Sequence, residues 1–429
     1  MYIFMKKTRI MGAAALLLLT ASCEKEKFDQ NIWNQFVDYQ FLIDNVDREH
    51  DWRLTHSDTV TIVTKKGQYW TVEVLTQNPY TTKSPEIAAK GLLFTNREQD
   101  GYAATLAYTL PIDQQQAYVG IRNEDGQYIG VVPFTMGSDT VNLDLASITH
   151  NGTLTEPQPQ TFTYLYEEGF PMPGDFDYND MVLRVSKSAT DVSYVVDLKV
   201  TLEAVGASKS YAGAILLAGV RYDDVVKVDI LEGSRMDQDY PLMRLNIDND
   251  KTLLRSRQGE AVINLFESAH YVLNNKLDEM GSIQTLYYNT EPTETEGTSA
   301  KVEPVTRTYR ITFANREAAQ LLTFEQIDPF IIQEFNGGLW EIHTYNYKFK
   351  ESLKNIYDGK ESFYDNHISW AIVVPKSDFR YTAEGTPLSS FQSDTGGTFG
   401  PYEAFSEWIK NHNSHHDWYV TPTRPQLLY

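Results

Sequence analysis

The sequence predicts a mainly β protein with two β-sandwich-like domains, the second with one or two peripheral helices. In most segments, apolar and polar residues alternate with the period of two that is typical of half-buried strands. Aromatic residues make up 13% of the 429 residues, enough for the chain to bury a sizeable core. A stretch rich in Gly, Pro, Gln and Thr, "THNGTLTEPQPQT" at 149–161, separates two such runs and is typical of a linker.

The predicted strands follow the alternation directly. Residues 69–74, "YWTVEV", place Trp70, Val72 and Val74 on one face. The same pattern predicts strands at 181–185, "MVLRV", at 193–204, "SYVVDLKVTLEA", and at 308–313, "TYRITF".

Two segments have helical spacing instead. In residues 260–275, "EAVINLFESAHYVLNN", apolar side chains recur at steps of three and four residues. In residues 401–412, "PYEAFSEWIKNH", Pro401 stands near the start, and Phe405, Trp408 and Ile409 lie on one side. We therefore expect a helix in each segment.

The amino terminus has the pattern of a lipoprotein signal. Three basic residues precede the apolar block "MGAAALLLL", which is shorter than the ~20 residues that a bilayer requires. Cys23, the only cysteine, follows two small residues and would be the acylated first residue after cleavage; a stray cysteine in an ordinary signal peptide is the alternative. The next residues, "EKEK", resemble the charged signals with which Bacteroidetes-type bacteria send lipoproteins to the outer face. We expect a lipid anchor in the outer membrane or at the cell surface.

These features predict the following organisation. Residues 1–22 are the signal peptide, and 23–27 are the lipidated anchor and tether. Residues 28–150 form the first β domain, and 157–429 form the second. Residues 289–304, "NTEPTETEGTSAKVEP", are rich in Thr, Glu and Pro and are expected to be a flexible surface insertion within the second domain.

The charge of the chain restricts its partners. Its formal net charge is −21, and a nucleic-acid-binding surface needs clustered Lys and Arg, so we expect no nucleic-acid partner. Strong acidity suits solubility at a cell surface and the binding of divalent cations. The sequence leaves the oligomeric state open.

The stretch "GDFDYND", Gly174 to Asp180, has the most specific chemistry. Four oxygen donors, Asp175, Asp177, Asn179 and Asp180, stand in six positions. In an extended chain the first three would share one face, and Ca²⁺ requires about six to eight such oxygens. The stretch is not an EF-hand, because Asp180 and Ser186 stand where that loop requires Gly and Glu. Glu167 and Glu168 are the nearest further ligands. A turn capped by acids and a catalytic acid pair are the alternatives.

With "YLYEEGFPMPGDFDYNDMVLRV" (164–185), this region resembles the LruC domain family of bacterial lipoproteins. Three later segments, "IDPFIIQEFNGGLWEIHTY" (327–345), "ISWAIVVPKSDFRYTAE" (368–384) and "YEAFSEWIKNHNSHHDWY" (402–419), resemble the same family in the same order. Asp328, Ser369 and Thr382 depart from its usual Asn and two prolines. The resemblance implies a lipid-anchored outer-membrane or secreted protein without an assigned activity. It also marks Glu341 and His343 as shared positions and as a second candidate ligand site.

Together these observations predict a calcium-stabilised surface protein that acts as a non-catalytic binding or adhesion module for a glycan or an envelope protein. One alternative is a secreted hydrolase that acts on polysaccharide through the acidic cluster. The other is a structural subunit of a surface assembly. Whether the chain is an enzyme stays open, with the non-catalytic interpretation favoured.

Overall fold

The computed structural model describes residues 46–65, 70–96, 101–144, 152–167, 174–236, 252–335, 338–344, 369–393 and 396–429. All of them belong to one compact unit, Leu42–Tyr429. The predicted signal peptide, Cys23 and Glu168 lie outside the described residues. The predicted division of the chain into domains near residues 150–157 stays a prediction.

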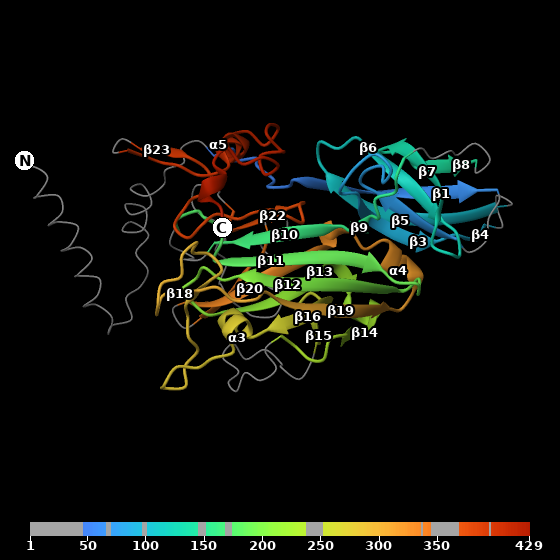
Figure 1. The fold of residues 1–429 in the computed structure, drawn as a ribbon. Coiled ribbons are helices and arrows are strands. Elements are labelled where there is room, and N and C mark those ends of the chain that lie inside the picture. The colour runs from blue at the N-terminus through green and yellow to red at the C-terminus, as the bar shows by residue number, and fades with distance from the viewer. Residues whose placement is uncertain are drawn as a thin grey trace, which may run out of the picture. The chain divides into compact units, whose positions relative to one another are not determined.

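The described fold is mainly β, as the sequence predicts (Figure 1). The amino-terminal part forms two sheets. One has the order β4 (Phe94–Asn96), β5 (Gly101–Pro111), β1 (Thr55–Thr64), β8 (Thr140–Leu143). The other has the order β7 (Tyr128–Thr135), β6 (Gln116–Arg122), β2 (Thr71–Leu75), β3 (Glu86–Leu92), β9 (Gln158–Pro159).

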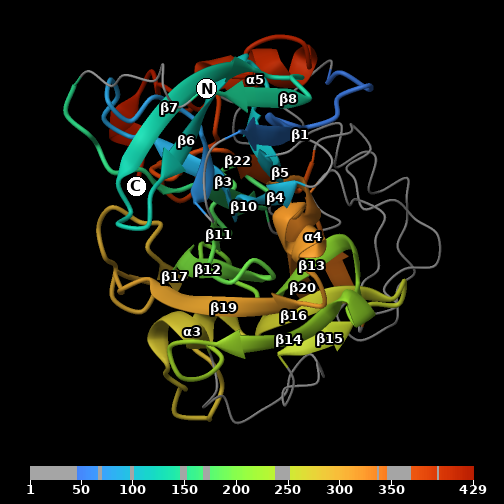
Figure 2. The same cartoon turned by 90° about the vertical axis from the view of Figure 1, so that its right-hand side faces the viewer.

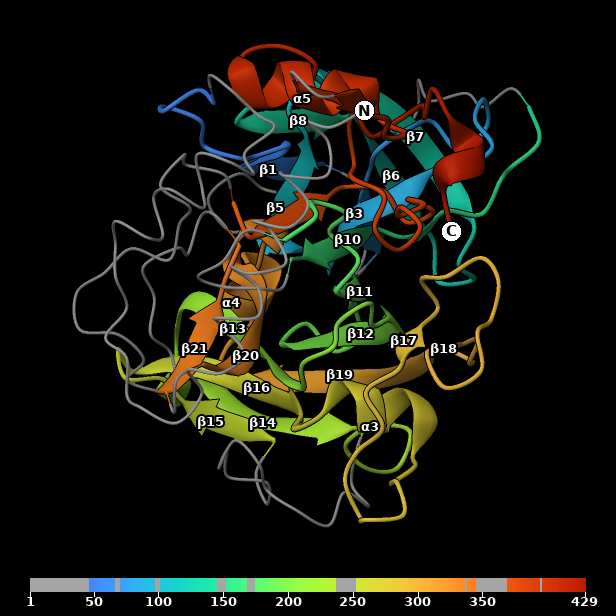
Figure 3. The same ribbon diagram turned by 90° about the vertical axis from the view of Figure 1, so that its left-hand side faces the viewer.

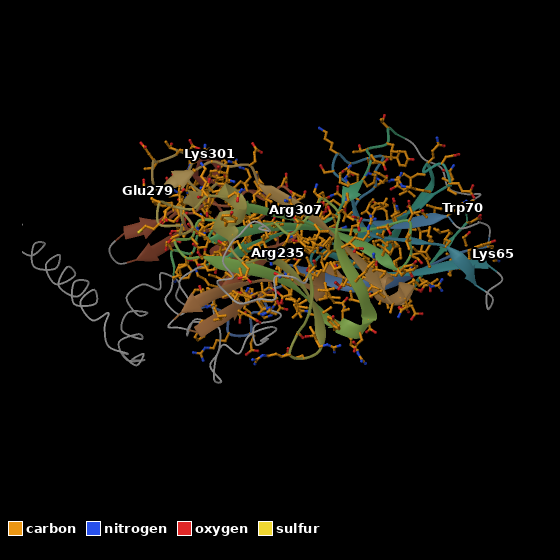
Figure 4. All side chains as sticks on the ribbon, turned by 90° about the horizontal axis from the view of Figure 1, so that it is seen from below. Lys65, Trp70, Arg235, Glu279, Lys301 and Arg307 are labelled. Atoms are coloured by element: carbon orange, nitrogen blue, oxygen red, sulfur yellow. The ribbon has the colours of Figure 1, made fainter. Side chains whose placement is uncertain are left out.

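One hydrophobic core lies between these two sheets. Val60 and Ile62 of β1 pack in it with Val72 and Val74 of β2, and Trp70, labelled in Figure 4, packs against it. Side chains from both sheets therefore form a single core, as in a β-sandwich.

The carboxyl-terminal part adds two further sheets, one of six and one of five strands. The six-stranded sheet has the order β14 (Val225–Ile230), β19 (Val305–Phe313), β12 (Val195–Ala204), β11 (Met181–Ala189), β10 (Thr161–Tyr166), β22 (Ala371–Val374). The five-stranded sheet has the order β15 (Leu253–Arg255), β16 (Glu260–Phe266), β13 (Tyr211–Arg221), β20 (Ile327–Phe335), β21 (Gly338–Ile342), with β21 at its edge (Figure 3). The predicted strands at 181–185, 193–204 and 308–313 are confirmed in β11, β12 and β19.

Smaller elements complete the described part. Two short ribbons pair β17 (Tyr287–Tyr288) with β18 (Ser299–Ala300) and β23 (Phe391–Ser393) with β24 (Gly396–Thr398). The helices are α3 (Ala269–Asn274), α4 (Arg316–Gln320) and α5 (Glu403–Lys410), with 3-10 turns η1 (Tyr222–Asp224), η2 (Phe324–Gln326) and η4 (Pro425–Leu427). Within the described ranges, no helix has the length and apolarity needed to cross a membrane.

The prediction of a helix at 260–275 is wrong for the first half of this segment. Residues 260–266 form β16, and only 269–274 form a helix, α3. Residues 261–266 are all buried, so the strand has no polar face and its apolar run imitates helical spacing. The helix begins after Ser268, whose side chain accepts a hydrogen bond from the Tyr271 backbone N–H.

The second predicted helix is confirmed in α5, which buries Phe405, Trp408 and Ile409 as expected. The predicted insertion at 289–304 contains β18 and internal hydrogen bonds, among them Ser299 Oγ to Glu291 Oε2 at 2.6 Å. Its flexibility stays a prediction.

The sequence pattern does not predict α4. This short helix contacts β3 and β5 of the amino-terminal sheets as well as β12 and β19 of the six-stranded sheet (Figure 2). Its first turn is capped by Asn315, whose side chain accepts a hydrogen bond from Ala318 N–H at 2.9 Å. The helix therefore lies where the amino-terminal sheets meet the six-stranded sheet.

Candidate functional site

The acidic stretch lies in the connection between two paired strands. β10 and β11 are antiparallel, with Tyr166 opposite Met181. Glu167 directly follows β10, and Asp180 directly precedes β11. The strand pairing thus brings Glu167 and the 174–180 loop to the same end of the six-stranded sheet.

Three carboxylates meet there. Glu167, Asp175 and Asp177 each offer an oxygen, and these oxygens all lie within 4.8 Å of one another. Glu167 and Asp177 are buried, whereas Asp175 is exposed. The cluster therefore has one side open to solvent.

Glu167 also holds the backbone of the loop. Its Oε1 accepts a hydrogen bond from the Phe176 N–H at 3.1 Å, and its Oε2 accepts one from the Tyr178 N–H at 3.0 Å. The carboxylate lies so close to Gly174 that a Cβ there would be 1.7 Å from Oε1. Glycine at this position permits that close approach.

The loop backbone differs from the predicted extended chain. Phe176 and Tyr178 both have left-handed conformations, with φ of 61° and 53°. Such conformations cost about 1–3 kcal/mol each for residues other than glycine and persist only where surrounding contacts hold them. Both aromatic side chains are buried, and the Tyr178 hydroxyl donates to the Ser369 carbonyl at 2.8 Å. Both aromatic side chains are thus buried in a loop whose backbone is strained at these two positions.

Asp177 is in an unfavourable position for a negative charge. Its burial raises the pKa of its carboxyl well above the ordinary value, and the nearby charges of Asp175, Glu167 and Glu384 raise it further. Hydrogen bonds from the Asn179 backbone N–H at 3.1 Å and the Gly385 N–H at 2.8 Å offset only part of this cost. A cation among these carboxylates would remove the repulsion.

The orientation of the Asn179 amide is fixed by its neighbours. Its Nδ2 donates to Asp177 Oδ2 at 2.8 Å and to the Thr382 carbonyl at 3.2 Å, and a carbonyl oxygen can only accept. Its Oδ1 is buried and has no hydrogen-bond partner among the described residues. A buried amide oxygen that accepts no hydrogen bond lowers the stability of the folded state, unless another group such as a cation binds to it.

Gly206 leaves room beside this oxygen. A Cβ on Gly206 would lie 2.1 Å from Asn179 Oδ1 and 2.7 Å from Glu384 Oε2. Asn179 and Glu384 therefore direct oxygens towards the same small region. Glu384 follows a segment that binds the loop through Thr382, whose hydroxyl donates to the Asp177 carbonyl at 2.7 Å.

The donor set fits a hard cation. All candidate ligands are oxygens, which Ca²⁺ and Mg²⁺ prefer. Oxygens on opposite sides of a Ca²⁺ ion lie about 4.6–5.2 Å apart, given Ca–O distances of about 2.3–2.6 Å. The carboxylate oxygens of the cluster, which all lie within 4.8 Å of one another, are close enough to contact one such ion.

The structure brings some of the predicted ligands together and leaves others apart. It brings Asp175, Asp177 and Glu167 together, with Asn179 hydrogen-bonded to Asp177. Asp180 is buried but does not belong to the carboxylate cluster found among the described residues. Glu384 is the residue that sequence reasoning missed, although it ends the family-like segment at 368–384.

Glu341 and His343, the second predicted pair, form a separate buried group. His343 Nε2 lies 3.0 Å from Glu341 Oε2, and His343 Nδ1 lies 2.5 Å from Asp328 Oδ2. Because both ring nitrogens face carboxylate oxygens, the imidazole must be doubly protonated to donate to both. Burial lowers the pKa of His343, but the charge and hydrogen bond of Asp328 and those of Glu341 together raise it to about 9. The ring nitrogens are thus already engaged by protein groups.

Comparisons with solved structures give only distant likenesses. A crystal structure described as a "Putative lipoprotein from Bacteroides ovatus" is 14% identical, with a TM-score of 0.45, and the alignment covers 83% of this chain and 98% of that one. The full-length major pilin SpaD from Corynebacterium diphtheriae is 9% identical, with a TM-score of 0.14, and the alignment covers 80% and 90% of the two chains. Neither likeness is strong enough to support a functional argument. No curated protein matches the sequence.

A family model gives the firmer result. The model described as "Domain of unknown function (DUF4842)" matches residues 193–419. The match spans more than half of the chain and includes Glu384, Glu341 and His343. The protein therefore belongs to the DUF4842 family.

Proposed function

We propose that this protein is a lipid-anchored envelope protein whose β fold is completed by a calcium ion and which acts as a non-catalytic binding module for a glycan or another envelope protein. The observation that carries the calcium site is the meeting of three carboxylates whose oxygens lie within 4.8 Å of one another. Asn179, whose Oδ1 has no hydrogen-bond partner among the described residues, is hydrogen-bonded to one of them, Asp177. Glu167, Asp175, Asp177 and Asn179 would hold the ion, with Glu384 as a further ligand.

The anchor and the location rest on the amino-terminal sequence. Cys23 follows a signal-like segment, and it is the only cysteine. The resemblance of residues 164–419 to the LruC domain family supports the same location. The surface-assembly alternative has no specific support in the described residues.

Calcium is expected to stabilise the protein. A site that only the folded chain forms adds about 2.7 kcal/mol when free calcium is 100 times its Kd. Thermal unfolding of the chain should therefore occur at a higher temperature in calcium than after chelation with EGTA. In Asp175→Asn, which removes an exposed ligand charge, calcium affinity should fall at least tenfold when measured by calorimetry.

Asp125→Asn is the matched control, because Asp125 is an exposed turn residue outside the cluster. This variant should respond to calcium like the wild type. Asp177→Ala should remove the difference between the calcium and EGTA samples altogether. Equal unfolding temperatures of the wild-type protein in both conditions would rule out the calcium site.

Lipidation has a direct test, because no other cysteine can carry the label. Cells that express the chain and are fed a labelled fatty acid should incorporate it into the protein, and the protein should partition into the detergent phase. Cys23→Ser should lose both the label and the partitioning. Label that persists in Cys23→Ser would exclude the predicted anchor site.

Assays on a panel of glycans separate binding from hydrolysis. The proposed module should retain a glycan or an envelope protein without turnover. Turnover that disappears in Asp177→Ala would favour the hydrolase alternative, in which two carboxylates flank the bond that is cleaved.

A further inference from the structure

A cavity of about 180 Å³ lies where α4 meets β3, β11 and β12, away from the acidic cluster. Its walls are mainly small apolar side chains, among them Ala89, Ala107, Ala189 and Val196. An engineered cavity of about 150 Å³ in another protein holds a benzene molecule. The volume therefore suits a ligand of about one ring with a small substituent.

Lys187 of β11 is a buried basic residue on the wall of this apolar cavity. The residue lines the cavity and is only 8% exposed. Its ammonium group donates to the Leu322 carbonyl at 2.6 Å and lies 5.7 Å from the centre of the Phe324 ring. An ammonium group has three N–H donors, and no carboxylate pairs with Lys187 among the described residues.

Buried charges in proteins are normally paired, because desolvation of a lone ammonium is expensive. Here burial lowers the pKa of Lys187 to about 8, so the group is still largely protonated at neutral pH. Lys187, which lines the cavity, thus carries a buried cation for which the described residues supply no carboxylate partner.

Two further groups on the cavity wall can donate hydrogen bonds. Gln320 of α4 has a buried Nε2 without a hydrogen-bond partner in the described part of the chain. Lys90 of β3 is partly exposed and lies 3.8 Å from the exposed Asp191. Among the described residues no carboxylate lines the cavity, and its two charged side chains, Lys187 and Lys90, are both cations, which favours an anion.

We propose that this cavity binds a small apolar carboxylate, with the carboxylate paired to Lys187 and hydrogen-bonded by Gln320, and with the apolar body among the alanines. The anion supplies the missing counter-ion, and the apolar body fills space that water would occupy poorly. The site is independent of the proposed calcium site, since no residue belongs to both.

Sodium benzoate and its neutral isostere benzamide test the proposal by isothermal titration calorimetry on the full chain. Benzoate should bind, and benzamide should bind at least tenfold more weakly, because it cannot pair with the ammonium. Benzoate affinity should fall as the pH rises above about 8, where Lys187 loses its proton. Within the described part of the chain, Lys90 is the one other titratable side chain that lines the cavity.

Lys187→Met keeps an unbranched side chain but removes the charge, and it should weaken benzoate binding at least tenfold. Lys199→Met is the matched control, because Lys199 is exposed on the neighbouring strand β12, opposite Ser186. It should bind benzoate like the wild type. Thermal unfolding of both variants checks that they fold. The proposal is overturned if benzoate does not bind, if benzamide binds equally well, or if folded Lys187→Met keeps full affinity.

Discussion

Replacing His343 with alanine is expected to lower the free energy of unfolding by about 3–5 kcal/mol at neutral pH, the range found when one partner of a buried ion pair is removed. The imidazolium lies between Asp328 and Glu341, and all three side chains are almost fully buried. Without it, Asp328 and Glu341 would lose their shared partner in a buried site, where desolvation raises the pKa of Asp328. Urea unfolding at neutral pH measures the loss.

The same charge should make stability depend on pH. The folded-state pKa of His343, about 9, lies above the ordinary value of 6.5, so its stabilisation is fully present below about pH 6.5 and is lost as the pH rises towards 9. The difference in stability between wild type and His343→Ala should therefore shrink over this window.

His412→Ala is the control, because His412 also pairs with an acid, Asp47 at 2.6 Å, but in a partly exposed position. Its loss should cost only about 0–1 kcal/mol. A loss of less than about 1 kcal/mol in His343→Ala would show that the buried charges do not stabilise the fold.

The strands were predictable where one face of the sheet is more exposed than the other. Leu198, Val200 and Leu202 of β12 are buried, while Lys199 between them is exposed, so the period of two is visible in the sequence. In β16 both faces are buried, and periodicity alone cannot distinguish such a strand from a buried helix. The error at 260–275 has this cause.

The acidic site was predictable only in its local part. Asp175 and Asp177 stand two residues apart, and Glu167 is close along the chain, so the sequence itself places them together. Glu384 reaches the same region from more than 200 residues away, and its position depends on the contacts of Thr382 and Gly385 with the loop. Tertiary contacts of this kind leave no periodic signal.

The buried His343 group shows the same limit. The sequence places Glu341 and His343 on one face of a strand, but their third partner, Asp328, lies on the other side of the hairpin formed by β20 and β21. Asp328 stands where the resembling family usually has Asn. Its hydrogen bonds to His343 and to the Thr344 hydroxyl give this departure a structural role that the sequence does not show.

Lys187→Met is expected to raise the free energy of unfolding at neutral pH, by up to about 3 kcal/mol in the absence of a ligand. Burial lowers the pKa of this lysine from 10.5 to about 8, and each unit corresponds to about 1.4 kcal/mol. Methionine fills a similar volume without a charge, and a buried charge is often replaced by an apolar residue with a gain in stability. Lys199→Met, at an exposed position, should change stability by less than about 0.5 kcal/mol.

The sign of the pH dependence distinguishes a buried charge from improved packing. Below about pH 8 both the folded and the unfolded wild type carry the proton on Lys187, so the folded state bears the full desolvation cost. Between about pH 8 and 10.5 the folded state loses this proton first, so wild-type stability rises relative to Lys187→Met. The advantage of the variant in urea unfolding should therefore decline across this window. If the extra stability of Lys187→Met stays constant with pH, methionine stabilises the fold through packing alone. If the variant is less stable than the wild type at neutral pH, the buried ammonium does not destabilise the fold.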